Sequence, residues 1–211
     1  MIVIAIDGPA GAGKTTVARA VAAALGFKHV DTGGMYRAVA LLSLERGVDP
    51  SDGSALEEIC RQVDIWAVDG EVAIGGRDVS ELVRRPDVTQ IVSVVAAHPE
   101  VRSQMTRSQR SMAQSVDVVM EGRDIGSVVF PDADLKIFLT ASLEERSRRR
   151  SAESGGDPAE VQRLILQRDS ADEGRDASPL AVAQGAIEVD STGRSIDDVV
   201  AEIQRSLEDI R

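Results

Sequence analysis

One short stretch constrains the fold of this chain more than any other: residues 8–15 read Gly-Pro-Ala-Gly-Ala-Gly-Lys-Thr. This spacing fits the pattern G-x-x-x-x-G-K-[ST], in which a glycine-rich loop wraps the phosphates of a nucleotide. The glycines let backbone N–H groups point into one concavity, and the helix that follows presents its positive end to the anion. Lys14 can reach the β- and γ-phosphates, and the Thr15 hydroxyl can ligate Mg²⁺. The candidate ATP-contacting residues of this stretch are Gly8, Pro9, Ala10, Gly11, Ala12, Gly13, Lys14, Thr15 and Thr16.

The neighbouring sequence decides between such a phosphate loop and a glycine-rich turn of another α/β protein. Residues 2–6 form an apolar run that is typical of a buried parallel strand. Residues 15–25 are rich in alanine and are followed by Gly26, which predicts a helix with a glycine C-cap. Strand, loop and helix occur in the order that a P-loop requires, and we interpret the stretch as one.

Composition narrows the class of protein. A length of 211 residues allows one sizeable core with a small insertion, and a net charge of −11 argues against general affinity for nucleic acid or anionic membranes. The single cysteine, Cys60, excludes an internal disulfide framework and favours a reducing cytosol. The chain has no asparagine and therefore lacks the N-K-x-D motif of a GTPase. We expect a cytoplasmic monomer whose partners are small molecules, without nucleic acid or membrane.

Hydrophobic periodicity predicts an α/β fold with a five-stranded parallel sheet flanked by helices. After the first strand and helix, parallel strands are expected near residues 27–30, 116–120, 135–139 and 186–189. Helices are expected near residues 35–46, 55–62, 86–97, 100–115, 142–150, 158–172 and 195–207. Residues 63–85 differ, because an Asp-Gly turn between alternating segments predicts an antiparallel meander.

These elements predict one P-loop domain with two appendages. The core is expected to comprise residues 1–35, 116–145 and 176–211. Residues 36–115 then form an inserted lobe that carries the meander, and residues 146–172 form a short lid. Three predicted strands end in polar segments: the P-loop, residues 31–33 and residues 121–124. Because ligands bind at the carboxyl ends of strands in open α/β sheets, we expect these segments to converge on one crevice.

Arginine outnumbers lysine by 21 to 3, and its positions suggest a second phosphate site. An enzyme that phosphorylates a phosphate must hold two phosphates in line, for which the planar, permanently charged guanidinium is well suited. The candidates are Arg37, Arg123, Arg146, Arg149, Arg150, Arg168 and Arg175. We interpret those after residue 145 as part of a mobile lid over the phosphates. A solvated helix face is the alternative for members of residues 146–150, and Arg148 fits it best.

Four segments together resemble one family. They are residues 8–16, 31–37 (Asp-Thr-Gly-Gly-Met-Tyr-Arg), 121–133 (Glu-Gly-Arg-Asp-Ile-Gly-Ser-Val-Val-Phe-Pro-Asp-Ala) and 168–172 (Arg-Asp-Ser-Ala-Asp), and they are similar to motifs of bacterial cytidylate kinases. The resemblance covers essentially the whole chain, including the β insertion. It implies Mg²⁺-dependent transfer of the γ-phosphoryl group of ATP to CMP, and to dCMP, giving CDP or dCDP and ADP.

The resemblance also implies roles for single residues. Thr32, Arg102 and Asp124 correspond to positions that read the pyrimidine base, where a carboxylate can accept from the amino group that distinguishes cytosine from uracil. Ser93 and Asp172 correspond to positions that hold the sugar hydroxyls. The positions around the acceptor phosphate are Tyr36, Arg37, Arg123, Arg168 and Arg175. The implied catalytic cations are Lys14, Arg123, Arg168 and Arg175, and the implied lid contacts to ATP come from Arg146, Arg149 and Arg150.

The chain departs from the family pattern at the strand-end acid, which is Glu121 where other members carry aspartate. Its predicted role is to position a Mg²⁺-bound water, with structural support of its neighbours as the alternative. No general base is expected, because the acceptor oxygen is already anionic. Histidine-based acid chemistry is not expected, because His29 and His98 are predicted to lie away from the motifs and to be structural or exposed.

Two other functions remain open at this point. The first is a P-loop kinase for another acceptor, such as UMP, AMP or a shikimate-like molecule. The second is a nucleotide-dependent switch that transfers no phosphate to a metabolite. The cluster of acceptor-side arginines argues against a switch, because a switch has no need of a second phosphate pocket.

Overall fold

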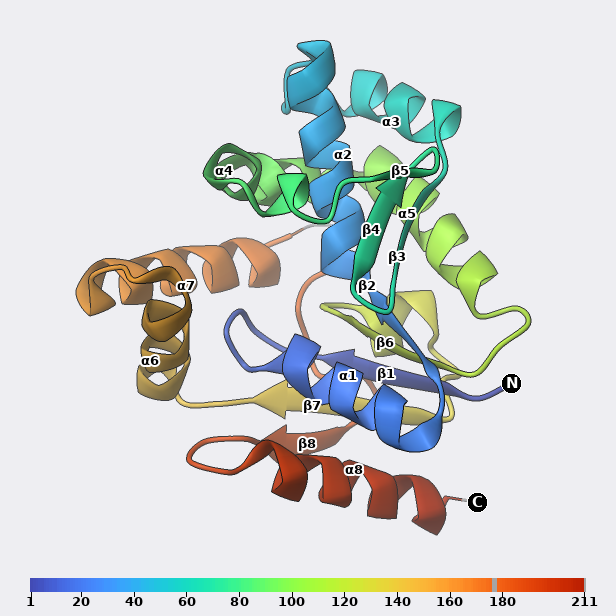
Figure 1. Ribbon diagram of the computed structural model, residues 1–211, viewed down its shortest axis with the longest axis vertical. Coiled ribbons are helices and arrows are strands. Elements are labelled where there is room, and N and C mark those ends of the chain that lie inside the picture. Colours follow the sequence, from blue (N-terminus) through green and yellow to red (C-terminus); the bar gives the residue numbers. More distant parts are fainter. Residues whose placement is uncertain (176–177, 211) are drawn as a thin grey trace.

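The computed structural model describes residues 1–175 and 178–210 (Figure 1). Its central strands are β1 (Val3–Asp7), β2 (Lys28–Asp31), β6 (Val118–Gly122), β7 (Leu135–Thr140) and β8 (Ile187–Asp190). They pair in parallel, in the spatial order β2-β6-β1-β7-β8. The predicted α/β class and the five parallel strands are confirmed within the described residues.

The sheet is larger than predicted, because the meander joins it. β3 (Ile65–Val68), β4 (Glu71–Ile74) and β5 (Arg77–Asp78) pair antiparallel with one another, and β3 pairs with β2 through Val68 and Val30. The result is one eight-stranded sheet, ordered β5-β4-β3-β2-β6-β1-β7-β8, rather than a five-stranded sheet with a separate hairpin. The physical reason is that β2 ends the parallel part, and an edge strand offers unpaired backbone groups to another strand.

Helices connect these strands, and their ends follow local capping chemistry. α2 begins at Thr32, three residues before the predicted start at Met35, because the Asp31 carboxylate accepts the Gly34 N–H at 2.9 Å and caps the helix. Pro158 at the start of α7 and Gly26 after α1 occupy the expected first and last positions. The helices are α1 (Lys14–Leu25), α2 (Thr32–Arg46), α3 (Gly53–Gln62), α4 (Pro86–Val95), α5 (Pro99–Met112), α6 (Leu143–Ser154), α7 (Pro158–Glu173) and α8 (Ile196–Asp209), with short helical turns η1 (Leu82–Arg84) and η2 (Ile125–Val129).

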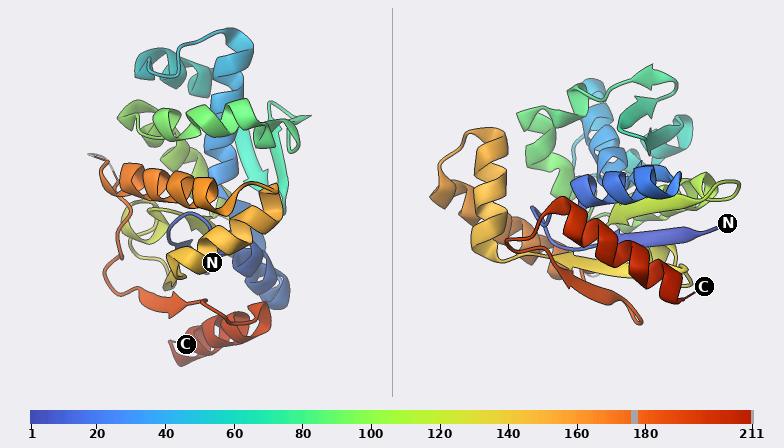
Figure 2. Two further views of the ribbon diagram at one scale, coloured as in Figure 1. Left: turned by 90° about the vertical axis from the view of Figure 1, so that its left-hand side faces the viewer. Right: turned by 60° about the horizontal axis from the view of Figure 1, so that its bottom comes forward.

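The apolar side chains form cores on both faces of the sheet and a further core in the inserted part of the chain. α1 and α8 lie side by side over one face, where they pack on β1, β6 and β7 (Figures 1 and 2). η2 helps to cover the opposite face. None of the described helices is both long enough and apolar enough to cross a membrane.

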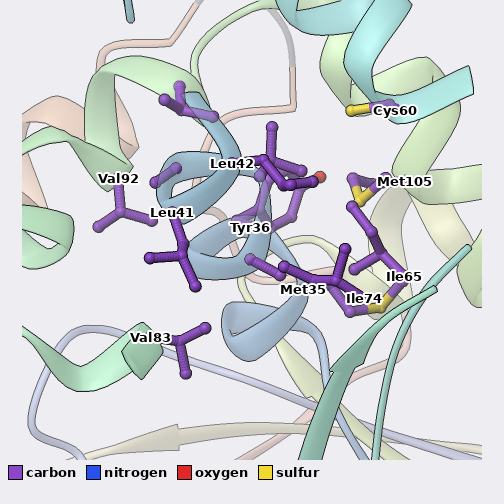
Figure 3. Close-up of a cluster of buried hydrophobic side chains, with 14 of the residues drawn as sticks. Met35, Tyr36, Leu41, Leu42, Cys60, Ile65, Ile74, Val83, Val92 and Met105 are labelled. Carbon is purple, nitrogen blue, oxygen red and sulfur yellow. The ribbon is translucent and has the colours of Figure 1, made fainter. Parts of the chain in front are cut away.

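The core of the inserted part, which corresponds to the predicted inserted lobe at residues 36–115, surrounds α2. Figure 3 shows α2 side chains between those of the meander, α3 and α5 and those of η1 and α4; the labelled residues are Met35, Tyr36, Leu41, Leu42, Cys60, Ile65, Ile74, Val83, Val92 and Met105. α6 and α7 form a separate helical pair beside the end of the sheet that carries the P-loop (Figure 1). The end of the sheet that carries the P-loop therefore faces the inserted part on one side and the helical pair on the other (Figure 1).

Candidate active site

The P-loop runs from the end of β1 to the start of α1 and is shaped by its glycines. Gly8, Gly11 and Gly13 all have positive φ, at 150°, 76° and 89°. A Cβ atom on Gly8 would lie 2.0 Å from the carbonyl oxygen of Leu139 on β7, so this position also requires glycine for its close approach to the sheet. The turn places the loop at the carboxyl end of β1.

Lys14 is buried at the first turn of α1, against the loop. Its Nζ donates to the carbonyl oxygen of Pro9 at 2.8 Å. Burial, and then the charge of Arg123, lower the pKa of Lys14 well below its usual value. A cation held in this way gains from an incoming anion, which is the chemistry expected of a phosphate-binding lysine.

Two arginines of α6 contact the backbone of the P-loop. Arg146 donates to the carbonyl oxygen of Ala10 at 2.9 Å and forms an ion pair with Asp169 of α7, whose other oxygen accepts the Ala10 N–H at 3.0 Å. Arg149 donates to the carbonyl oxygens of Ala12 at 3.3 Å and Ser191 at 2.8 Å. In this structure both guanidinium groups support the shape of the loop.

The other two arginines of this run are exposed. Arg148 pairs with Glu145, at 2.8 Å, so it lies on the solvated helix face that the sequence suggested for it. Burial is the main cause of the lowered pKa of Arg37 and Arg168, and the charge of Arg150 adds to it.

Thr15 and Glu121 meet at the start of α1 and the end of β6. The Thr15 hydroxyl donates to Glu121 Oε2 at 2.9 Å, and the Glu121 side chain is buried. A hydroxyl and a carboxylate are oxygen ligands of the kind that Mg²⁺ takes, together with water and substrate phosphate. The residues present therefore fit a Mg²⁺ site that completes its coordination with ATP.

His29 belongs to this group of residues, so the prediction that it lies away from the motifs was wrong. It is buried on β2, and its Nε2 lies 2.9 Å from Glu121 Oε1. Pairing of β2 with β6 in parallel brings the two residues together. His98, by contrast, lies in the inserted part, with its Nε2 2.9 Å from the carbonyl oxygen of Pro50.

A cluster of like charges lies beside the P-loop. Arg123, after β6, donates to Asp172 of α7 at 2.8 Å, and Arg175 pairs with the other oxygen of the same carboxylate. Burial alone would raise the pKa of Asp172, but Arg123 and Arg175 lower it overall.

Arg168 lies in the same cluster, where burial and the charge of Arg123 lower its pKa to about 9. Its Nε is buried and has no hydrogen-bond partner among the described residues. Three guanidinium groups around one carboxylate leave positive charge that an anion would neutralise.

Two of the three predicted base-reading residues, Arg102 and Asp124, form a buried pair. Arg102 of α5 pairs with Asp124, donates to the carbonyl oxygen of Ala96 at 3.0 Å and stands 5.4 Å from the ring centroid of Tyr36. Burial raises the pKa of Tyr36 to about 12, so its hydroxyl stays protonated at neutral pH. Thr32 donates to the carbonyl oxygen of Glu121 at 2.7 Å. A carboxylate acceptor and a guanidinium donor thus lie together next to an aromatic ring.

Two residues predicted to bind the acceptor, Arg37 and Ser93, lie in the inserted part of the chain. Arg37 of α2 donates to the Thr89 hydroxyl of α4 at 2.8 Å and to the carbonyl oxygen of Val83 at 3.3 Å. Burial, and then the charge of Arg150, lower its pKa. Ser93 is half-buried on α4, one turn after Thr89. These contacts tie α2 to α4 and to η1.

Asp7 is a buried residue next to the P-loop that the sequence reasoning missed. It is the last residue of β1, and its carboxylate accepts the N–H groups of Ile125 at 2.9 Å and Gly126 at 2.8 Å. It therefore joins the strand before the P-loop to the turn after Asp124. Burial raises its pKa to about 6, although the two hydrogen bonds act to lower it. A charged residue that ends an apolar strand directly before Gly8 was the available sequence signal.

The raised pKa of Asp7 predicts a pH dependence of stability. Because the folded-state value of about 6 lies above the usual 3.8, protonation of Asp7 stabilises the fold below pH 4, and this contribution is lost as the pH rises through about 6. Between pH 4 and pH 7 the wild type should lose about 2 kcal/mol of unfolding free energy relative to Asp7→Asn. Urea denaturation of both proteins at both pH values measures this difference. A difference that does not change with pH contradicts the assignment.

Comparison with known proteins places the chain in a family. A sequence model described as cytidylate kinase matches residues 4–209. The cytidylate kinase of Caldanaerobacter subterraneus is 48% identical, over 97% of this chain and 93% of the relative. That of Carboxydothermus hydrogenoformans is 47% identical, over 95% of this chain and 94% of the relative.

Solved structures of other kinases share the fold. A shikimate kinase from Bacteroides thetaiotaomicron superposes with a TM-score of 0.51 at 17% identity, over 98% of each chain. A sugar kinase from Janibacter superposes with a TM-score of 0.53 at 16% identity, over 100% of this chain and 95% of the other. At these identities the likeness concerns the fold alone, and the sequence matches decide the family. The chain belongs to the cytidylate kinase family.

Proposed function

We propose that the protein transfers the γ-phosphoryl group of ATP to CMP and dCMP in a direct, Mg²⁺-dependent step, giving ADP with CDP or dCDP. ATP-dependent phosphorylation of CMP is the activity of the family to which the chain belongs. The observation that carries the proposal is the buried Asp124–Arg102 pair next to the cluster of Arg123, Arg168 and Arg175. A pyrimidine reader and a phosphate binder lie on the same side of one P-loop.

The P-loop and Lys14 form the donor side. The N–H groups of the loop hold the β- and γ-phosphates, and Lys14 exchanges its bond with Pro9 for phosphate oxygens. Thr15 would hold Mg²⁺ directly and Glu121 would hold it through water, and the ion would supply charge neutralisation at the ATP phosphates. Lys14 then stabilises the charge on the transferred group.

The acceptor side needs cations and no base. A CMP phosphate oxygen is already anionic, so positioning and charge neutralisation supply the acceleration. Arg123, Arg168 and Arg175 face this phosphate, and Arg37 approaches it from the inserted part. Asp172 keeps the arginines together before substrate binds and then accepts from a sugar hydroxyl. The three arginines neutralise the transferred group from the side opposite Lys14.

Asp124 is the residue that selects cytosine. Its carboxylate only accepts hydrogen bonds, so it pairs with the amino group of cytosine and repels the carbonyl oxygen that uracil carries at the same place. Arg102 holds the carboxylate in position and donates to ring acceptors of the base. Selection therefore depends on one charged acceptor in a buried setting.

Replacing Asp124 by alanine should lower the preference for CMP over UMP by about 10- to 100-fold, the worth of one hydrogen bond to a charged group. The measurement is the ratio of kcat/KM for the two nucleotides. Asp132→Ala is the matched control, because Asp132 is an exposed aspartate in the loop after η2, and it should leave the ratio unchanged. An Asp124→Ala protein with the wild-type ratio would show that the base pocket is elsewhere.

Steady-state assays of the purified protein test the function itself. ADP formation is measured with CMP, dCMP, UMP, AMP and shikimate as acceptors, with ATP and Mg²⁺ present. The proposal expects the cytidylates to give the highest kcat/KM. A clear preference for another acceptor would assign the protein to a different P-loop kinase activity, and failure of CMP to stimulate ADP formation would favour a nucleotide-dependent switch.

A further inference from the structure

We propose that His29, fixed in place by the Asp69-Gly70 turn of the meander, is a positioning residue that orients the Glu121 carboxylate and so sets the affinity of the site for Mg²⁺. The proposal rests on the proposed function, because it deepens the role assigned there to Glu121. It also gives the β insertion a task in the donor half of the site.

The side chains of His29, Glu121 and Thr15 form one buried chain of contacts. His29 Nε2 lies 2.9 Å from Glu121 Oε1, and Thr15 Oγ1 donates to Glu121 Oε2 at 2.9 Å. The exposed fractions of the His29 and Glu121 side chains are 2% and 5%. Because a carboxylate only accepts, the ring proton must be on Nε2. Contacts on both oxygens prevent the carboxylate from rotating.

The main chain of Glu121 is fixed as well. Its carbonyl oxygen accepts the Thr32 hydroxyl at 2.7 Å. Glutamate has one more rotatable bond than aspartate, so its carboxylate needs a partner to hold it in one place. His29 provides that partner on the side away from Thr15.

The meander fixes His29 from the other side of β2. Asp69 accepts the N–H of His29 at 3.0 Å through its side chain, and its own N–H donates to the carbonyl oxygen of His29 at 2.9 Å. Asp69 also pairs with Lys28 at 2.6 Å. Its φ of 51° and the φ of 91° at Gly70 form the tight turn that brings these groups to β2. The backbone of His29 is thus held at both polar atoms by one residue of the insertion.

The second ring nitrogen of His29 indicates that packing alone does not account for a histidine at this position. His29 Nδ1 is buried and has no hydrogen-bond partner among the described residues. An unsatisfied buried nitrogen costs about 1–3 kcal/mol, and an apolar side chain at this position would avoid that cost. The polar contribution of the imidazole is therefore its contact with Glu121, the acid beside Thr15.

The test measures metal affinity without the acceptor substrate. Mn²⁺ stands in for Mg²⁺ and is titrated into the protein with a non-hydrolysable ATP analogue, with bound Mn²⁺ followed by electron paramagnetic resonance. His29→Leu should weaken Mn²⁺ binding by about 10-fold, within the range for removing a residue that orients a metal ligand. His29→Gln places an amide nitrogen near the original Nε2 and should restore most of the affinity. His29→Asn is too short to reach Glu121 and should resemble His29→Leu.

Kinetics separate positioning from general damage. At subsaturating Mg²⁺ the rate of His29→Leu should fall, while its KM for CMP stays within about twofold of the wild-type value. Asp69→Gly keeps the left-handed turn, removes the carboxylate and should weaken Mn²⁺ binding by less than His29→Leu. His98→Leu is the matched control and should leave Mn²⁺ binding unchanged.

Three outcomes overturn the proposal or part of it. Unchanged Mn²⁺ affinity in His29→Leu overturns it outright, provided that the wild type phosphorylates CMP. If His29→Leu does not fold, equal Mn²⁺ affinities of His29→Gln and His29→Asn overturn it in the same way. Unchanged affinity in Asp69→Gly removes the meander from the proposal. A wild type that binds Mn²⁺ with the ATP analogue and does not phosphorylate CMP overturns the proposed function instead.

Discussion

Lys14→Ala is expected to lower kcat by about 100- to 1,000-fold, while KM for CMP changes by less than about threefold. Lys14 is the cation of the P-loop, and burial lowers its pKa, so its charge is most stable when an anion is close. The charge on the transferred group develops in the transition state, and the loss therefore falls on kcat. Steady-state kinetics with ATP and CMP measure both constants.

The stability of Lys14→Ala separates catalysis from folding. Removing a buried cation should leave the thermal midpoint unchanged or raise it. Lys136→Ala is a matched control, because Lys136 is a lysine of β7 that donates to the carbonyl oxygen of Gln184 at 3.0 Å outside the site. It should keep the wild-type kcat. A tenfold or smaller loss of kcat in Lys14→Ala contradicts the assigned role.

Asp169→Ala is expected to reduce the unfolding free energy by about 3–5 kcal/mol, because it breaks a buried ion pair. Asp169 is 6% exposed, accepts the Ala10 N–H at 3.0 Å and pairs with Arg146. Its removal leaves a buried guanidinium without its counter-charge. For a chain of this length the thermal midpoint should fall by about 10 °C.

Two further variants control the Asp169 experiment. Glu160→Ala removes an exposed acid from the same helix, where it pairs with Arg163, and should shift the midpoint by no more than about 1 °C. Asp169→Asn keeps a side-chain oxygen for the Ala10 N–H and should lose less stability than Asp169→Ala. Equal midpoints for Asp169→Ala and Glu160→Ala would show that the buried pair does not support the loop.

The parts of the fold that follow from local chemistry could be predicted from the sequence. The apolar runs, the Asp-Gly turn at residues 69–70 and the P-loop each carry their signal within a few residues. The sequence has no such local signal for the edge of the parallel sheet with which the meander pairs. That choice depends on the pairing of Val30 with Val68, two residues far apart in the chain. An apolar residue such as Val30 would be equally suitable in a strand at the other edge.

The site was predictable where a strand end supplies the residue. Asp124, Arg123 and the P-loop follow strands, so convergence was expected from topology alone. His29 was missed because it precedes the motif by two residues. His29 on β2 pairs with Val119 on β6. Glu121 is two residues after Val119, and side chains two residues apart on a strand lie on the same face of the sheet. His29 and Glu121 are therefore diagonal neighbours on adjacent strands. The alternation of side chains between the two faces of each strand, together with the order of the strands in the sheet, would have identified the pair.

The directions of side chains could be read only in part from the run of arginines at residues 146–150. The sequence suggested that Arg148 faces solvent, but it did not indicate that Arg146 and Arg149 contact the backbone of the P-loop. Arg146 and Arg149 contact the backbone of the P-loop, whereas Arg148 faces solvent. That division depends on the angle at which α6 approaches the loop, which is a property of the folded chain.

The contact between Asp169 and Arg146 fixes the C-terminal part of α7 to α6 and, through the Ala10 N–H, to the P-loop. Pro158 and Asp169 are eleven residues apart on this helix, so about 16 Å of α7 lies between the helix start and this contact. Arg168 is next to the contact, and Asp172, which Arg123 holds, is one turn further along. The cation of Arg168 and the carboxylate that pairs with Arg123 therefore belong to the anchored end of α7, and a displacement of the helix start would leave them in place.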